Sequence, residues 1–465
     1  MSKYFATTPI YYVNDVPHIG HTYTTVAADV ITRFWKQKGY DARLLTGTDE
    51  HGAKIAEAAK AHDEEPKEYA DKIAAEYKKS WDLLNIDYAR FIRTTDEDHL
   101  KTAQDFLQKL YDNGAIDAKP RLYEGLYCVS CEKFWKEEDL KEGLCPDHLK
   151  PPIKHSEENY YFNLSKYRDQ LTELISENKI KVGPHTRKNE ILGKLKQGLE
   201  DISISRANLE WGIPLPFDPK HTSYVWIEAL INYYTYGKPN GIWPADLHLV
   251  GKDILWFHSV IWPAMLLAIN EELPKEVFAH GFFSINGQKM SKTLGNVIKP
   301  ADLISKYGVD GTRVVLLAAF PFGEDGDFSF ENLDQIYNSH LANGLGNLTA
   351  RVAKLCENSG FEAKEKVNHF DPEVEKLLGE FKFNEALNWI WKIVQRADQR
   401  VNETAPWKLE GIELQEVLDE LVSLILDIAF NLQPFMPETS EKILKQFSGS
   451  VKSRPSLFPR LNSGS

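Results

Sequence analysis

The chain has 465 residues, of which 42% are hydrophobic and 12% aromatic. It can therefore bury a large core, and we expect two or three domains rather than one. Its formal net charge of -13 argues against a protein that coats nucleic acid nonspecifically, because such binding depends on Lys and Arg, but leaves room for a localised site. The sequence contains neither a signal peptide nor the roughly 18 consecutive apolar residues of a membrane span, so we expect a cytoplasmic location.

The first part of the chain alternates predicted strands and helices. Residues 4–12 are rich in aromatic and β-branched residues, which is typical of a strand, and the apolar spacing of 26–35 predicts a helix. A second strand over 43–46 runs into the segment 47–52, and a helix is predicted over 53–61. This order indicates a Rossmann-like parallel sheet, whose ligands bind at the carboxyl ends of its strands.

The domain organisation follows from changes in this pattern. Aromatic clusters, cysteines and irregular charged stretches interrupt the alternation, which indicates an inserted module, and a long helical pattern ends the chain. We predict a parallel-sheet domain in two halves, 1–114 and 213–275, an insert over 115–212, a linker region with a basic loop over 276–335, and an all-α domain over 336–465.

Shorter elements are predicted in the later part of the chain. A strand over 247–251 is followed by a helix over 256–267, which Pro263 is expected to kink. The pair Asn-Gly at 286–287 is a strong hairpin signal. Residues 450–465 are predicted to be a loosely packed tail.

Three of the four cysteines lie close together with a histidine. Cys128 and Cys131 form one pair and Cys145 and His148 a second, and each pair is separated by two residues. Two such pairs on turns can close a tetrahedral zinc site, and four protein ligands leave no open position, so we predict one structural zinc per chain. The alternative is a set of unliganded buried thiols. Cys356 stands alone and is predicted to be a buried apolar filler.

Two short segments could bind phosphates. His18, Gly20 and His21 open the first predicted helix, where a glycine lets a ligand approach the backbone and the free N–H groups attract anions. Lys289 and Lys292 lie on a basic loop that could fold over a triphosphate. Taken alone, the histidines could equally be capping or packing groups, and the lysines would more often form a solvated charged turn.

Together the two segments resemble the signatures of the class I aminoacyl-tRNA synthetases. The first reads HIGH over 18–21 and the second KMSKT over 289–293, in which Thr293 replaces the usual serine. The likeness covers most of the chain and is greatest to the methionyl-tRNA synthetases, through four further segments: 8–14, 47–52, 224–229 and 251–254. Glu228 stands where that family more often has Asp.

The resemblance implies a fold and a reaction. The fold is a Rossmann-like catalytic domain with a zinc-bearing insert, followed by an all-α anticodon-binding bundle. The carboxylate of methionine would attack the α-phosphate of Mg-bound ATP, and the methionyl-adenylate would then pass methionine to the 3′ end of tRNA(Met). Such a reaction needs no protein nucleophile, because positioning and charge stabilisation carry it.

The resemblance also assigns residues to the substrates. It places Asp49 at the ammonium group of methionine, and the other methionine-binding residues are Ile10, Tyr12, Trp226, Ala229, Tyr233 and His258. An apolar, aromatic pocket suits a thioether, although without the resemblance core packing would be the favoured interpretation of Trp226 and Tyr233. ATP binding and catalysis are assigned to His18, His21, Lys289 and Lys292, and ATP binding alone to Gly20, Arg206 and Asp253.

A polar helix face in the all-α domain completes the resemblance. Asn343, Asn347 and Arg351 are spaced four apart and so share one face, which is usually only solvated. The segment resembles the anticodon-reading helix of the family, and Trp407 its stacking tryptophan, a combination that suits unpaired bases. Because the chain ends soon after this domain, without the dimerisation module of some relatives, a monomer is expected.

Two other functions remain as alternatives. A synthetase for leucine, isoleucine or valine would need an editing insertion larger than the predicted insert, and a cysteine enzyme would hold metal at its substrate. A tRNA-binding protein without catalysis would be free to lose the phosphate-binding signatures, whereas both are present.

Overall fold

The computed structural model describes residues 2–128, 133–135, 137–146, 149–207, 209–290 and 296–461. These fall into two compact units. Unit 1 comprises Met1–Pro17, Asp41–Lys79 and Tyr88–Ala279. Unit 2 comprises His18–Tyr40, Ser80–Asp87 and His280–Ser465.

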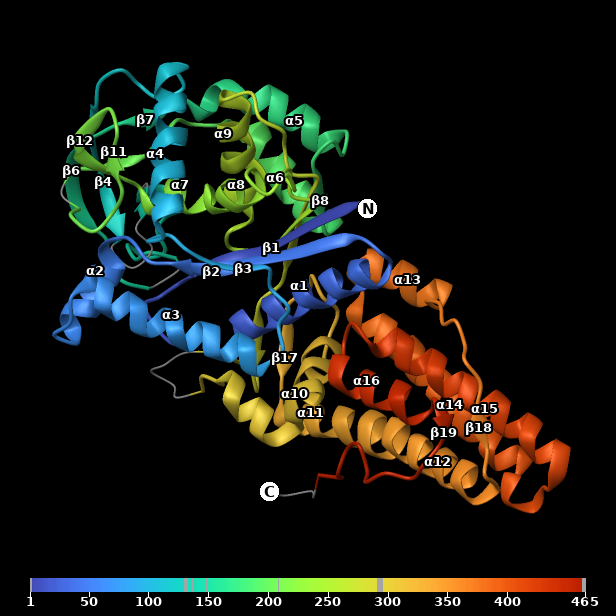
Figure 1. The fold of residues 1–465 in the computed structure, drawn as a ribbon. Coiled ribbons are helices and arrows are strands. Elements are labelled where there is room, and N and C mark those ends of the chain that lie inside the picture. Colours follow the sequence, from blue (N-terminus) through green and yellow to red (C-terminus); the bar gives the residue numbers. More distant parts are fainter. Residues whose placement is uncertain are drawn as a thin grey trace. The chain divides into compact units, whose positions relative to one another are not determined.

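A six-stranded sheet is the centre of unit 1 (Figure 1). In spatial order its strands are β3 (Arg90–Arg93), β2 (Asp41–Asp49), β1 (Lys3–Tyr12), β13 (Leu247–Gly251), β14 (Glu276–His280) and β8 (Lys181–Gly183). Parallel pairings join β1 to β2 and β13, β2 to β3, and β14 to β8. The predicted Rossmann-like parallel sheet is confirmed, because short stretches rich in β-branched and aromatic residues favour buried strands.

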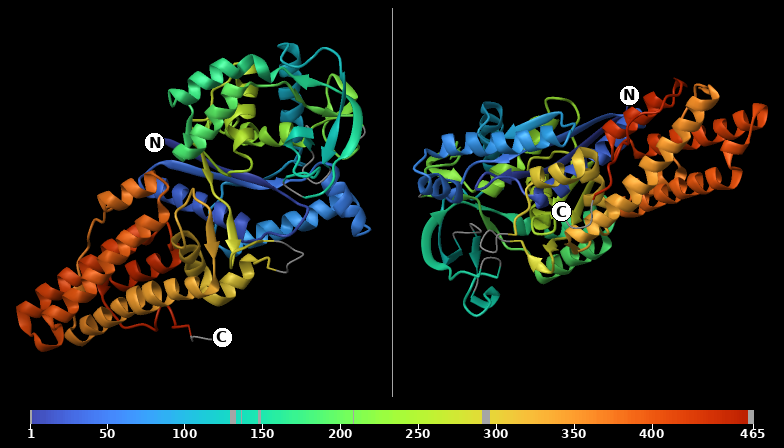
Figure 2. Two further views of the ribbon diagram at one scale, coloured as in Figure 1. Left: turned by 180° about the vertical axis from the view of Figure 1, so that it is seen from behind. Right: turned by 90° about the horizontal axis from the view of Figure 1, so that it is seen from below.

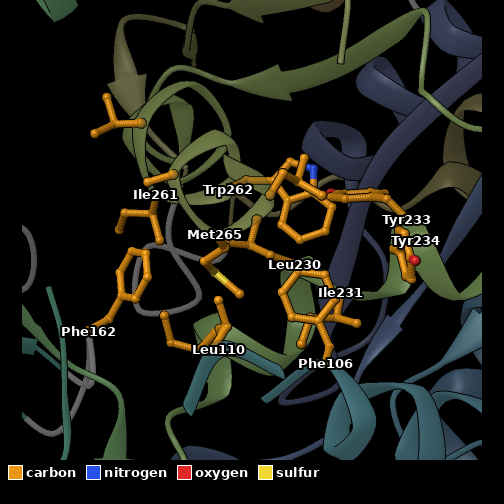
Figure 3. Close-up of a cluster of buried hydrophobic side chains, with 14 of the residues drawn as sticks. Phe106, Leu110, Phe162, Leu230, Ile231, Tyr233, Tyr234, Ile261, Trp262 and Met265 are labelled. Carbon is orange, nitrogen blue, oxygen red and sulfur yellow. The ribbon is translucent and has the colours of Figure 1, made fainter. Parts of the chain in front are cut away.

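Helices pack on this sheet within unit 1. They are α2 (Ala53–Ala61), α3 (Pro66–Leu83), α4 (Glu97–Asp112), α5 (Arg168–Ser176), α6 (His185–Gln197), α7 (Val225–Leu230), α8 (Asn232–Gly237) and α9 (Trp262–Ala268). The helices α4, α7, α8 and α9 lie on one face of the sheet (Figure 1). Their apolar side chains converge in the cluster of Figure 3, where the rings of Phe106 and Trp262 stack with centroids 5.7 Å apart.

The helix predicted over 256–267 has a different form from the one expected. A π-helical turn, Phe257–Ile261, precedes α9, and Pro263 falls in the first turn of α9. The π-helical turn runs directly into α9, so Pro263 lies inside a continuous helical stretch, and a local irregularity of this kind accommodates a proline there. The irregularity therefore lies before the proline, and it contains His258.

Along the chain, the stretch between α4 and α7 forms small antiparallel sheets. One consists of β5 (Lys133–Trp135), β4 (Arg121–Cys128) and β6 (Ile153–Asn159), and another of β10 (Ser205–Arg206), β12 (Asp218–Ser223) and β11 (Pro214–Leu215). A third pairs β7 (Tyr161–Phe162) with β9 (Ile202–Ser203). The stretch 115–212 also contributes β8 to the main sheet, so the division at these boundaries stays a prediction.

Unit 2 is mainly helical, as predicted for the end of the chain. Its helices are α1 (Ile19–Gln37), α10 (Pro300–Ala318), α11 (Phe330–Ile336), α12 (Asn347–Ser359), α13 (Pro372–Gly379), α14 (Phe383–Thr404), α15 (Gly411–Leu432) and α16 (Pro437–Gln446). A π-helical segment, Tyr337–Gly346, joins α11 to α12. The long helices α14 and α15 run side by side in both Figure 1 and Figure 2, and the predicted apolar stripe of α15, including Leu421 and Ile425, is buried between them and their neighbours.

Short strands complete unit 2. A small sheet contains β16 (Gln288–Lys289), β15 (Phe283–Ile285) and β17 (Gly326–Phe328), and β18 (Glu362–Ala363) pairs with β19 (Gly449–Ser450). Asn286 and Gly287 both have positive φ, 51° and 73°, which confirms the predicted hairpin turn between β15 and β16.

The stretch 450–461, predicted to be a loosely packed tail, is docked at Val451 and near Phe458, while most of its other side chains are exposed. Val451 and Phe458 are 1% and 7% exposed. The side chain of Asn338 accepts a hydrogen bond from the N–H of Leu461 at 2.9 Å and donates one to its carbonyl at 3.2 Å. Phe458 packs against the helical segment at Gly346. Residues 462–465 lie outside the described part of the chain.

A buried ion pair holds the helices of unit 2 together. The guanidinium of Arg313 in α10 and the carboxylate of Asp29 in α1 are both fully buried, with Nη2 and Oδ2 2.6 Å apart. The other guanidinium donors reach backbone carbonyls at 2.8 to 3.2 Å, those of Leu84, Pro434 and Phe435. Burial by itself would raise the pKa of Asp29, but the charges of Arg313 and Arg33 hold this pKa below its usual value. The pair is therefore ionised and fully hydrogen-bonded.

Replacing Arg313 by Met should lower the free energy of unfolding by about 3–5 kcal/mol, because it leaves the Asp29 carboxylate buried without its main partner. Urea unfolding followed by circular dichroism measures the change. The control is Arg400→Met, which removes an exposed pair with Glu420 and should shift the transition little. Equal transitions for the two variants would contradict a stabilising role for the pair.

Candidate active-site residues

The two histidines of the first signature cap their own helix in unit 2. The Nδ1 atom of His18 accepts from the N–H of Gly20 at 3.1 Å, and that of His21 accepts from the N–H of His18 at 3.3 Å. The two rings stack with centroids 3.8 Å apart. Because both Nδ1 atoms accept, the proton of each neutral ring is on Nε2. Burial, together with the neighbouring His18, lowers the pKa of His21 well below its usual value, so its ring is a neutral donor at pH 7.

Gly20 is required by this stacked arrangement. A Cβ atom at this position would lie 2.8 Å from Cε1 of His18, which is too close for a side chain. The glycine predicted to admit a ligand therefore also admits the neighbouring imidazole. Capping and phosphate binding are compatible, since capping uses only the Nδ1 atoms.

The second signature follows the β15–β16 hairpin. The backbone of Lys289 belongs to β16, and residues 291–295, which include Lys292 and Thr293, lie outside the described part of the chain. The hairpin is attached to the start of α1. Tyr23 packs against Phe283 with ring centroids 5.7 Å apart, and the N–H of Ile19 donates to the carbonyl of Ile298 at 2.9 Å. Unit 2 thus brings the first signature close to both ends of the second.

The predicted methionine residues belong to unit 1. Trp226 stacks on Phe257 with ring centroids 4.2 Å apart, and Tyr12 meets Trp226 edge to face at 5.8 Å. Ile10 packs against the same apolar cluster, and Ala229 is 4% exposed. Sequence reasoning missed Phe257, although its position next to His258 could have suggested it.

A second contact joins Tyr233 and His258. The hydroxyl of Tyr233 donates to Nε2 of His258 at 2.7 Å, because Nδ1 of the same ring donates to the carbonyl of Ile254 at 3.0 Å. Burial lowers the pKa of His258 to about 4 and raises that of Tyr233, so both side chains are neutral at pH 7. This end of the predicted pocket is therefore uncharged, as a thioether requires.

Asp49 lies at the carboxyl end of β2 and is only 2% exposed. The next residue, Glu50, is held by Arg93 through two bonds of 2.6 and 2.8 Å and by the hydroxyls of Thr48 and Thr95. The indole N–H of Trp211 donates to the carbonyl of Glu50 at 2.6 Å. Sequence reasoning missed these partners because all of them except Thr48 come from distant parts of the chain.

The two residues assigned to ATP in unit 1 differ in their surroundings. Arg206 is 9% exposed, donates to the carbonyl of Ser205 at 2.7 Å, and lies 4.3 Å from the ring centre of Tyr224. These contacts favour a role in architecture. Asp253 is exposed just after β13, at a carboxyl end of the parallel sheet.

Half of the predicted zinc ligands lie in the described part of the chain. Cys128 and Cys145 are 3% and 0% exposed, whereas Cys131 and His148 fall outside the described residues. Among the residues that the structure describes, no group of three or more candidate ligands could hold a metal. Two buried cysteines fit half of a closed tetrahedral site. Cys356 is buried as predicted, and burial raises the pKa of its thiol to about 12.

The predicted anticodon residues lie in the helical part of unit 2. Asn343 and Asn347 are exposed and line one groove of about 500 Å³, whose other wall includes Phe458 and Arg460. Arg351, one turn further, donates to Asp398 at 2.5 Å and to Asn402 at 2.8 Å. Trp407 is 57% exposed, which is unusual for a large aromatic side chain and suits a stacking surface.

Within the described residues, no helix combines the length and the apolar composition that crossing a membrane requires.

Comparison with known proteins identifies the family. The chain matches the family described as tRNA synthetases class I (M) over residues 4–151 and 139–353. It is 45% identical to the methionine–tRNA ligase of Clostridium acetobutylicum, covering 98% of this chain and 75% of that protein, and 43% identical to that of Thermotoga maritima, covering 97% and 76%. The Mycobacterium tuberculosis methionyl-tRNA synthetase in complex with methionyl-adenylate superposes with a TM-score of 0.91 at 35% identity, over 99% of this chain and 100% of that chain. The chain therefore belongs to the methionyl-tRNA synthetase family of class I aminoacyl-tRNA synthetases and has the activity of a methionine–tRNA ligase.

Proposed function

We propose that this ligase activates methionine with Mg-bound ATP and transfers it to the 3′ end of tRNA(Met), using the residues of the two signatures for the phosphates. The observation that carries the assignment is the attachment of the β15–β16 hairpin to the start of α1 in unit 2. Through it the capping histidines lie near the described residues on either side of the basic loop, Phe283 and Ile298. A solved relative is titled as a complex with methionyl-adenylate, the intermediate of such a reaction.

In the first step an oxygen of the methionine carboxylate attacks the α-phosphorus of ATP, and the bond to the pyrophosphate oxygen breaks. Neutral His18 and His21 would donate hydrogen bonds from Nε2 to phosphate oxygens, since their Nδ1 atoms are used in capping. Lys289 and Lys292 would neutralise charge on the departing pyrophosphate. In the second step the 3′-terminal ribose hydroxyl attacks the carbonyl carbon and releases AMP.

Methionine would lie between polar and apolar parts of unit 1. The Asp49 carboxylate would bind the ammonium group, and Trp226 and Tyr12 would contact the side chain. The neutral pair of Tyr233 and His258 supports this arrangement, because an ionised group next to the thioether would have to be desolvated on binding. Sulfur–aromatic contacts add modest affinity.

Exchange of labelled pyrophosphate into ATP, run separately with methionine, leucine and cysteine, tests the activation step. Exchange should depend on methionine. Replacing Lys292 by Ala should lower the exchange rate roughly a hundredfold while methionine binding, measured by calorimetry, changes little, because the lysine stabilises charge that develops in the transition state. Folded wild-type protein that exchanges with leucine but not with methionine would refute the proposal.

We further propose that Cys128, Cys131, Cys145 and His148 hold one structural zinc ion. The burial of Cys128 and Cys145 supports this, because soft ligands around a closed site are shielded from water. The metal would fix the loops that β4 and the neighbouring turn leave, and it would take no part in the reaction.

Metal analysis of the purified protein should find about one zinc per chain. The variant Cys145→Ser should lose it, whereas Cys356→Ser, which replaces a buried cysteine of unit 2, should retain it. Equal zinc contents in these two variants would show that the ion is bound elsewhere.

We also propose that Asn343, Asn347, Arg351 and Trp407 bind the anticodon. Amide groups along the groove could read base edges, and the exposed indole could stack on an unpaired base. The ion pair of Arg351 with Asp398 would orient the guanidinium. A monomer and a cytoplasmic location remain predictions from the sequence.

Substituting Trp407 by Ala should raise the KM for tRNA(Met) about tenfold in aminoacylation, since stacking of one base contributes roughly 1–3 kcal/mol. Pyrophosphate exchange, which needs no tRNA, should be unchanged. The matched control is Trp389→Ala on α14, whose indole N–H is already bonded to Asp371. An unchanged KM in Trp407→Ala would exclude this tryptophan from tRNA binding.

A further inference from the structure

A buried carboxylate in unit 1 lies between two imidazoles. The side chain of Glu228 is 1% exposed. Its Oε1 is 2.8 Å from Nδ1 of His51, and its Oε2 is 3.0 Å from Nε2 of His99. Both oxygens thus accept from a ring N–H. The resemblance assigned no role to this residue and marked it only as a departure from the family, which more often has Asp there.

The carboxylate is charged. Burial by itself would raise the pKa of Glu228, but the charge and the hydrogen bonds of His51 and His99 lower this pKa below its usual value. A buried carboxylate is costly unless its oxygens are bonded, so loss of either imidazole leaves an unsatisfied charge. His99 is itself held by the hydroxyl of Thr235, 3.2 Å from Nδ1. The carboxylate and both rings therefore form one connected network.

This network joins the two parts of the proposed methionine site. Glu228 belongs to the short helix α7, which also carries Trp226 and Ala229. His51 follows Asp49 by two residues. The bond between Glu228 and His51 therefore links the helix of the apolar wall directly to the segment of the ammonium-binding carboxylate.

The segment on the Asp49 side is rigid. Glu50 is pinned by Arg93, and the N–H of Gly52 donates to the carbonyl of Trp211 at 3.1 Å, while the ring of Trp211 lies 5.2 Å from that of His51. Because these contacts restrain the segment, we expect α7 to absorb a change in the Glu228 to His51 bond. The displacement would reach Trp226, which is less than one helical turn away.

The length of the side chain matters for the same reason. A glutamate reaches both imidazoles, at 2.8 and 3.0 Å. An aspartate would hold its carboxylate about 1.5 Å closer to the backbone, one carbon–carbon bond, and could keep both contacts only if α7 moved.

We propose that Glu228 is a positioning residue that sets the distance between the Asp49 carboxylate and the Trp226 wall, and thereby the affinity of this enzyme for methionine. The inference rests on the proposed function, since it takes the methionine site to be at these residues. It adds a residue that touches no substrate and acts through His51 and α7.

Pyrophosphate exchange with the full chain tests this role. Glu228→Gln preserves shape but removes the charge and one acceptor, so one ring N–H would face an amide N–H. The KM for methionine should rise about tenfold, while the KM for ATP stays within about twofold and kcat changes less than the methionine KM. The matched control is Glu271→Gln, a partly buried carboxylate of unit 1 that accepts from Tyr234 and Lys238 and should leave all three constants unchanged.

Two more variants keep the test decisive. Glu228→Asp retains the charge, and its methionine KM should lie between those of the wild type and Glu228→Gln. His99→Asn removes the outer imidazole, on α4, and should raise the methionine KM even if Glu228→Gln fails to fold. A methionine KM equal to that of the wild type in Glu228→Gln, or in His99→Asn where Glu228→Gln is unfolded, would overturn the proposal. A wild-type protein that does not exchange with methionine would instead refute the proposed function.

Discussion

The organisation of unit 2 depends on one buried charge pair, Asp29 with Arg313. Neither charge can be buried alone, and the guanidinium is satisfied only when α1, α10 and the chain before α16 are all in place. The first signature begins α1, and the second starts in β16 and ends before α10. A single electrostatic requirement therefore restrains α1, which begins with the first signature, and α10, which is the next helix after the second.

Polar contacts also organise unit 1, where apolar packing alone would leave the pocket poorly specified. Glu50 precedes His51 in the chain and Glu228 accepts from it, and each of these buried carboxylates has at least two donors. Hydrogen bonds are directional, so they specify the position of Asp49 more closely than apolar contacts would. The apolar residues determine the polarity of the predicted pocket, and the hydrogen-bonded network determines where its polar residues lie.

Two interpretations of the histidines of the first signature, helix capping and phosphate binding, are compatible. Capping occupies the Nδ1 atoms of His18 and His21, and the same bonds determine which nitrogen carries the proton. The helix end is thereby satisfied without using the Nε2 donors. A structural role and a catalytic role are thus assigned to different atoms of the same rings.

The sequence by itself determined the local elements and the family. Aromatic and β-branched residues predicted β1, apolar spacing predicted α1, and Asn-Gly at 286–287 predicted the hairpin, because these depend on neighbouring residues alone. The signature segments could also be identified from the sequence, since each is continuous in the chain. Only the tertiary structure revealed the docked tail at Phe458, the π-helical turn at His258, and the contact of Glu228 with His51, whose partners are 177 positions apart. Local periodicity records which face of an element is buried, but it carries no information about which distant side chain will satisfy a buried charge.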